Sequence, residues 1–125
     1  MINKRMSAAE FAREWIGAWN SHDLDRILDH YQDDFEITTP MIKLTLGGDA
    51  GTLKGKEAIG AYWRAALDKV PDLHFELLDV TEGVDSLAVY YKSILDKLAV
   101  EVMFFGEQAD EHGNQKVARV VVHYR

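Results

Sequence analysis

Apolar residues in the N-terminal part of the chain recur at helical spacing. Ser7 and Glu10 form a capping box, which predicts that a first helix begins at Ser7. Its apolar residues share one face and are Phe11, Trp15, Ala18 and Trp19. Asp23 can cap a second, short helix, and a third is expected over about 55–69, with Pro71 after its end. The pattern therefore predicts three helices.

After Pro71 the hydrophobic period changes to two, which indicates strands. The expected strands cover residues 73–81, 87–95, 98–109 and 116–124. An earlier strand is expected near Phe35, ended by Pro40, and the alternation of Ile42, Leu44 and Leu46 indicates a further short one. Helices followed by several consecutive strands that pair with their neighbours in an antiparallel meander predict an α+β fold. Three N-terminal helices would pack on one face of a strongly curved, mostly antiparallel sheet and leave a conical hollow.

Two of the expected strands, those over residues 98–109 and 116–124, carry apolar residues on both faces. The residues of segment 100–105 divide into Val100, Val102 and Phe104 on one face and Glu101, Met103 and Phe105 on the other. A sheet with one solvated face would instead alternate apolar with polar residues. One face can border the hollow. The other needs a partner, most simply a second copy of the chain in a twofold homodimer.

Composition narrows the classes of function. The 125 residues suffice for a single domain, 1–125, and the absence of cysteine excludes thiolate chemistry and suits a cytoplasmic protein. The apolar stretches are far shorter than the ~20 residues of a membrane helix, and Glu10, Arg13 and Glu14 argue against a signal peptide, so no membrane association is expected. A net charge of −7 with scattered basic residues argues against nucleic acid as a partner.

The histidines and aspartates give no sign of a metal site. The five histidines lack paired ligand spacing, so neither a metal nor another cofactor is expected. Asp23, Asp25 and Asp29 could suggest cation binding, but helix capping and a solvated helix face explain them better. The glycine-rich run 47–51 lacks the spacing of a phosphate loop and is expected to form a lid or rim over the hollow.

Segment 15–40 has a distinctive order of features. It reads W-I-G-A-W-N-S-H-D-L-D-R-I-L-D-H-Y-Q-D-D-F-E-I-T-T-P, with a helix end, a restart at Asp-Leu-Asp and Asp-Asp before a strand. Together with stretches 53–59, 99–103 and 116–124, it resembles the SnoaL-like proteins of the nuclear transport factor 2-like superfamily, which also contains ketosteroid isomerase. The resemblance covers nearly the whole chain. It implies a cone-shaped α+β domain with a cavity for a small molecule.

Ketosteroid isomerase combines a carboxylate base with an oxyanion hole made of a tyrosine and a protonated aspartic acid. By resemblance, these three positions fall on Thr39, Trp15 and Glu101, in that order. Threonine does not abstract a carbon-bound proton, and an indole donates a hydrogen bond without accepting one. Steroid isomerisation by that mechanism is therefore not expected, and Glu101 is left as the one candidate acid.

The resemblance and the strand parities together imply a lining for the hollow. The expected ligand-binding residues are Trp15, Trp19, Phe35, Ile37, Thr39, Tyr62, Trp63, Met103 and Val122, with Glu101 beside them. Core packing is the alternative for the aromatic residues, and an ion pair at an interface or sheet edge is the alternative for Glu101. Tyr90 and Tyr91 point to opposite faces, and the sequence leaves open which one faces the hollow.

The sequence thus predicts a domain of unassigned activity that holds a small apolar organic ligand. The alternative is an isomerase, cyclase or dehydratase that acts on a small carbonyl compound, with Glu101 as general acid or base.

Overall fold

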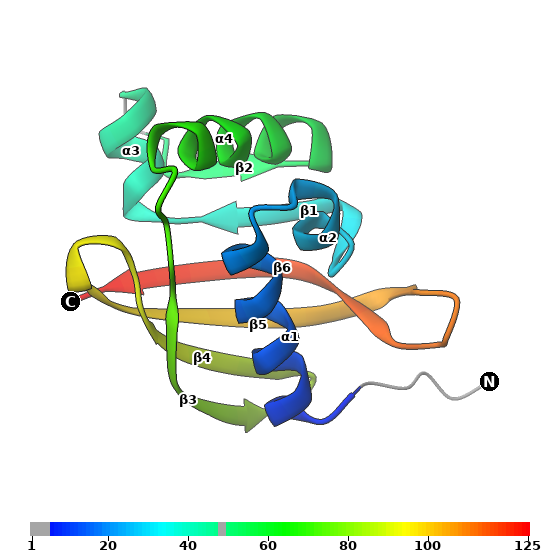
Figure 1. Ribbon diagram of the computed structural model, residues 1–125. Helices are drawn as coiled ribbons and strands as arrows, with labels where there is room; N and C mark the ends of the chain where they lie inside the picture. Colours follow the sequence, from blue (N-terminus) through cyan, green and yellow to red (C-terminus); the bar gives the residue numbers. More distant parts are fainter. Residues whose placement is uncertain (1–5, 48–49) are drawn as a thin grey trace.

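The computed structural model describes residues 6–47 and 50–125 (Figure 1). The basic residues at the N-terminus and part of the expected glycine-rich lid, Gly48 and Asp49, lie outside these ranges. No helix within the described ranges is long and apolar enough to cross a membrane.

The three expected helices are present as α1 (Ala8–Ser21), α2 (Leu24–Leu28) and α4 (Lys56–Lys69). The first two begin at side-chain caps. The Ser7 hydroxyl accepts a hydrogen bond from the Glu10 N–H at 3.2 Å, and the Asp23 carboxylate accepts one from the Arg26 N–H at 3.3 Å. Each cap satisfies a backbone donor that the first helical turn leaves free. Local sequence therefore determines where both helices begin.

The expected short strand at Ile42, Leu44 and Leu46 is wrong, because this segment forms a helix, α3 (Pro40–Leu46). The Thr39 hydroxyl caps it by accepting from the Met41 N–H at 3.3 Å, and proline in the first turn supplies a helical φ. Ile42 is buried, whereas Leu44 and Leu46 are exposed. The alternation of apolar residues in this segment therefore does not correspond to a strand with one buried face.

The described residues form one sheet of six strands in the order β2-β1-β6-β5-β4-β3. The strands are β1 (Tyr31–Thr38), β2 (Thr52–Lys54), β3 (Glu76–Gly83), β4 (Ser86–Lys92), β5 (Leu98–Ala109) and β6 (Gln115–Tyr124). A short 3-10 turn, η1 (Ile94–Asp96), joins β4 to β5. Only β1 and β6 pair in parallel, and the other neighbours are antiparallel. The predicted α+β class with a mostly antiparallel sheet is confirmed.

The helices lie on one side of this sheet. In Figure 1, α1 crosses in front of the strands and α4 lies across the β1–β2 end. The short helix α3, the η1 turn and the C-terminus gather at one end of the molecule, at the left of Figure 1, whereas the β5–β6 hairpin extends from the opposite end. The end with α3 and η1 therefore joins segments that are far apart in the sequence.

The two faces of the central strands differ in burial. On β5, Glu101 and Met103 are buried on the core side, whereas Val102 is partly exposed on the other side. Antiparallel pairing carries the same alternation to β4, where Tyr91 is buried and Tyr90 is partly exposed. The question left open by the sequence is thus answered, because Tyr91 is the tyrosine on the core side.

A register shift between β5 and β6 changes which residues of β6 face the core. Phe104 is opposite Arg119 and Phe105 is opposite Val117, so Ala118 is the extra residue of a bulge. Because of this bulge, Val117 and Val120 are both buried although they are three residues apart. Strict alternation along the sequence would have placed them on opposite faces.

Candidate functional site

A cavity of about 150 Å³ lies between α1, α4 and the core side of the sheet. Its apolar and aromatic lining residues are Trp19, Ile37, Met41, Tyr62, Trp63, Ala66, Leu73, Phe75, Tyr91, Ile94, Val122 and Tyr124. The lining also includes Leu95 and Lys97, whose side chains are exposed and therefore mark the opening, near η1. The lining includes residues of α3, of η1 and of the C-terminal end of β6, which lie at the same end of the molecule (Figure 1).

Four aromatic rings form a continuous wall of this cavity. The ring centroids are 5.0 Å apart between Trp63 and Trp19, 5.4 Å between Trp19 and Phe75, and 4.8 Å between Phe75 and Tyr91. We call these four residues the aromatic wall. Edge-to-face and tilted contacts of this kind hold rings in place, so the wall is a preformed apolar surface.

Glu101 is the one acidic residue among the described residues of the lining. Its side chain is buried, with 6% of the residue exposed, and the Tyr91 hydroxyl donates a hydrogen bond to its Oε1 at 2.7 Å. Its Oε2 has no hydrogen-bond partner among the described residues. Burial raises the pKa of Glu101 from 4.5 to about 7, although the Tyr91 hydrogen bond opposes this rise. The carboxyl group is thus poised to change protonation near neutral pH.

The structure does not show the alternative arrangement, in which Glu101 would form an ion pair with a lysine or an arginine. Lys92 pairs with Glu76 at 3.6 Å, and the Arg119 guanidinium lies 4.6 Å from the centre of the Phe104 ring. Among the described residues, no basic side chain forms an ion pair with Glu101. Glu101 therefore belongs to the cavity lining as a carboxyl group that forms no ion pair with a basic side chain of the described residues.

Trp19 supplies a second unsatisfied group. Its indole Nε1–H is buried and has no acceptor in the described part of the chain. Buried polar groups without partners are uncommon, because each loses its hydrogen bonds to water without replacement. Two of them, a donor on α1 and a carboxyl oxygen on β5, belong to residues that line the same cavity.

The remaining polar residues of the lining are neutral hydroxyls and one exposed lysine. Thr39 is buried and caps α3. Burial raises the pKa of Tyr124 to about 12, so its phenol stays protonated at neutral pH. Ser93 is buried, and Lys97 lies at the exposed opening. The described residues around the cavity contain no three-residue cluster that could hold a metal ion.

Seven of the ten residues that the sequence assigned to the hollow border the cavity, namely Trp19, Ile37, Thr39, Tyr62, Trp63, Glu101 and Val122. Trp15, Phe35 and Met103 do not line it. All three are fully buried in the core beneath the lining. The Trp15 Nε1–H donates to the Tyr31 hydroxyl at 2.7 Å, so it is not available to a ligand.

Sequence reasoning missed several lining residues, above all Phe75 and Tyr124, and left open the choice between Tyr90 and Tyr91. Tyr91 could have been found only from the β4–β5 register, in which Tyr91 is opposite Ala99. Phe75 precedes β3 and is held by Asn20, whose amide donates to the Phe75 carbonyl at 3.0 Å. That contact joins residues 55 positions apart and leaves no local signal.

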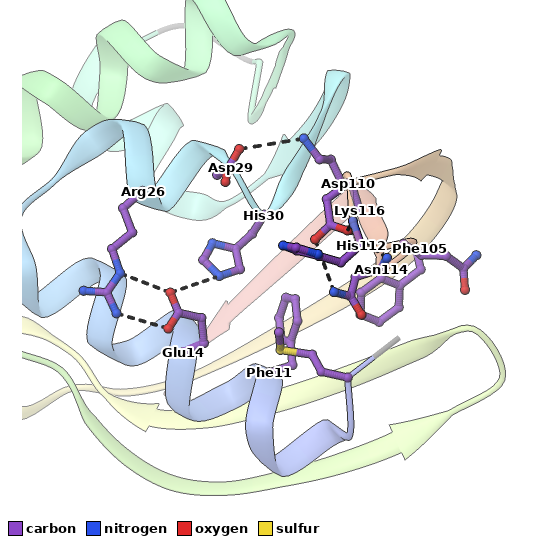
Figure 2. Close-up of a pocket in the computed structure, with 12 residues that line it drawn as sticks. Phe11, Glu14, Arg26, Asp29, His30, Phe105, Asp110, His112, Asn114 and Lys116 are labelled. Carbon is purple, nitrogen blue, oxygen red and sulfur yellow. Dashed lines mark hydrogen bonds and ion pairs between the residues drawn. The ribbon is translucent and has the colours of Figure 1, made fainter. Parts of the chain in front are cut away.

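A second hollow, of about 240 Å³, lies between the start of α1, the α2–β1 connection and the β5–β6 hairpin (Figure 2). Its charged groups already pair with one another. Glu14 accepts two hydrogen bonds from Arg26 at 3.1 Å, which lower the pKa of Glu14, and Lys116 lies 3.9 Å from Asp29. Although this hollow is larger, it offers a ligand fewer unsatisfied groups, so we take the cavity at Glu101 as the candidate site.

Helices over one face of a curved, mostly antiparallel sheet, with a cavity between them, define the nuclear transport factor 2-like fold. The family profile of the SnoaL-like domain matches residues 12–125, and the chain belongs to this family. A SnoaL-like protein of unknown function from Burkholderia thailandensis has a solved structure that is 48% identical, with a TM-score of 0.84 over 94% of each chain.

More distant structures share the fold. An NTF2-like protein of unknown function from Cytophaga hutchinsonii is 12% identical, with a TM-score of 0.69 over 99% of this chain and 95% of its own. A hypothetical protein with a ketosteroid isomerase-like fold from Catenulispora acidiphila, solved in complex with trimethylamine, is 12% identical, with a TM-score of 0.70 over 94% and 87% of the two chains. The comparison with curated proteins gave no match.

Proposed function

We propose that this SnoaL-like domain binds a small, largely apolar organic molecule in the cavity at Glu101. The observation that carries the proposal is the pairing of an aromatic lining with two buried polar atoms that lack partners, Trp19 Nε1 and Glu101 Oε2. Engineered apolar cavities of roughly 150 Å³ bind benzene, so the space suits a ligand of about that size. A ligand with one or two polar atoms would also satisfy the orphaned groups.

Filling the cavity should abolish binding. Ala66 lines the cavity, whereas its neighbour Ala65 is exposed on the same helix, α4. We expect toluene and phenol to bind the wild-type chain, and Ala66→Leu to weaken that binding roughly tenfold or more because the added carbons occupy the ligand's space. Ala65→Leu should leave it unchanged. Calorimetric titration would measure both. Equal effects of the two substitutions, or no binding to the wild type, would contradict the proposal.

An enzymatic role is the second candidate, and it is favoured by the burial of Glu101 in the cavity lining, which raises the pKa of this carboxyl group to about 7. The carboxyl group would act as general acid or base on a small carbonyl compound, in an isomerase, cyclase or dehydratase reaction. The free Nε1–H of Trp19, rather than that of Trp15, would donate to a developing oxyanion. Glu101→Gln should lower kcat/KM by roughly 10²–10⁴-fold in a substrate screen, and an unchanged rate would exclude this role.

We also propose that the chain forms a homodimer through the outer face of the sheet. That face carries partly exposed apolar side chains, namely Ala88, Tyr90, Val100, Val102, Phe104 and Val121. In the register Val102 lies between Ala88 and Val121, so the apolar surface continues across three strands. A twofold axis through such a patch would bury it against its own copy.

Placing a charge at the centre of this face should dissociate the dimer. We expect Val102→Lys to halve the mass that light scattering gives at micromolar concentration, because an unpaired ammonium group would be desolvated in the interface. Val84, which is 93% exposed in the β3–β4 turn, provides the matched control as Val84→Lys. A monomer mass for the wild type, or no difference between the two variants, would refute the proposal.

A further inference from the structure

The unpaired oxygen of Glu101 restricts which ligands suit the cavity. The residue is more than nine-tenths buried, its Oε1 accepts from Tyr91, and its Oε2 has no partner in the described residues. The energetic cost of a buried carboxyl oxygen without a hydrogen-bond partner can be reduced in two ways. It can hold a proton, or it can remain ionised and accept a hydrogen bond from a cationic ligand. The surroundings of the carboxyl group decide between these ligand chemistries.

The surroundings are aromatic. Six residues of the lining carry aromatic rings, namely Trp19, Tyr62, Trp63, Phe75, Tyr91 and Tyr124. Aromatic rings attract an ammonium group through their negative faces, and alkyl groups attached to its nitrogen also pack against them. A single carboxylate among aromatic rings is therefore a combination that favours an organic cation over a neutral molecule of the same shape.

Among the described residues, no basic side chain forms an ion pair with Glu101 and so competes with a cationic ligand for it. The titratable groups that face it are phenols, Tyr91 from β4, Tyr31 from β1 and Tyr124 from β6, and burial raises the pKa of each, so all three stay neutral. Of the described residues that line the cavity, Lys97 is the one basic residue, and it is exposed at the opening, where water and salt screen its charge. The net charge of −7 attracts cations in general.

We infer that the ligand of this cavity is a small organic cation, a protonated amine that donates its N–H to Glu101 Oε2 while its alkyl groups contact the aromatic wall. This inference rests on the proposed ligand-binding function and names the ligand class. The volume of about 150 Å³ limits the amine to a few carbon atoms. A ligand hydroxyl could in addition accept from the unpaired Nε1–H of Trp19.

Binding of such a cation must displace the proton of Glu101. Below the pKa of about 7 the carboxyl group is protonated, so amine binding should release close to one proton at pH 6 and little at pH 8. The affinity should accordingly rise about tenfold between these pH values, as the ionised fraction of Glu101 rises. A neutral ligand that accepts a hydrogen bond from the protonated acid would show the opposite dependence.

Two probes of the same shape test the inference. N,N-dimethylethanolamine carries a protonated nitrogen where 3-methylbutan-1-ol carries a CH group, and both keep the hydroxyl. By calorimetric titration at pH 8, the amine should bind at least roughly tenfold more tightly than the alcohol, with proton release that grows toward pH 6. Glu101→Gln should remove this preference. Glu107→Gln, which removes a charge from an exposed position of the same strand, should retain it.

Each outcome decides a different point. If the alcohol binds as tightly as the amine, or if amine binding releases no proton at pH 6, the cation inference is wrong and the proposed binding function stands. If neither probe binds and toluene also fails to bind, the proposed function fails and the inference fails with it. The comparison of the two probes on the wild-type chain does not depend on whether Glu101→Gln folds.

Discussion

Replacing Trp15 by alanine should lower the free energy of unfolding by about 3–5 kcal/mol. The residue is fully buried, and its ring lies 5.1 Å from that of Tyr91 and 6.2 Å from that of Phe75. Its Nε1–H also donates to Tyr31, whose buried hydroxyl would lose this donor. The substitution thus removes packing and a hydrogen bond from the layer that supports the cavity. Urea denaturation followed by far-ultraviolet circular dichroism would measure the change.

Trp19→Ala provides the comparison, because Trp19 borders the cavity and its Nε1–H has no partner to lose. We expect a smaller loss of stability for Trp19→Ala than for Trp15→Ala. Trp15→Phe should fall between the wild type and Trp15→Ala, since it retains a ring but not the hydrogen bond. If Trp19→Ala proved the more damaging of the two alanine substitutions, the assignment of Trp15 to the core and Trp19 to the cavity wall would be wrong.

Glu101→Gln should stabilise the protein relative to wild type by about 3 kcal/mol more at pH 8 than at pH 4. The folded carboxyl group ionises near pH 7, whereas the unfolded one ionises near pH 4.5. Between these values the folded state holds more protons than the unfolded state, so the stability of the wild type falls as the pH rises. The loss is complete above about pH 7. Glutamine has no such proton and avoids the loss.

Urea denaturation of both proteins from pH 4 to pH 8 would test this dependence. Other titrating groups contribute equally to wild type and variant, so the difference between them isolates Glu101. Glu107→Gln is the matched control, and its difference from wild type should not follow the same profile because Glu107 is exposed. A constant difference between wild type and Glu101→Gln over the whole range would mean that Glu101 ionises normally in the folded protein.

Much of the fold could be predicted because its signals are local. Ser7 and Asp23 mark helix starts within three residues of the donors that they cap, and the helical period over 56–69 needs no distant partner. The α3 helix was missed although Thr39 and Pro40 form a valid start signal, because the alternation of apolar residues after them suggested a strand. Two local signals competed, and the capped helix formed.

The site was only partly predictable because its geometry depends on how deeply each side chain is buried and on the register in which the strands pair. Trp15 and Trp19 lie one turn apart on the same face of α1, and no helical pattern distinguishes the buried ring from the one at the cavity. The choice between Tyr90 and Tyr91 required the pairing of β4 with β5. The bulge at Ala118 changed the parity of β6 without a signal in the local pattern.

The sequence by itself determined the α+β class, the superfamily resemblance, an aromatic core and an acid at Glu101 on a strand with two apolar faces. These properties follow from residue order over a few positions, which governs helix period, strand alternation and caps. Only the tertiary structure decided that Glu101 is buried beside Tyr91, that its pKa is raised to about 7, and that Trp19 borders the cavity. Burial and hydrogen bonding depend on residues brought together from distant segments, and no local pattern records them.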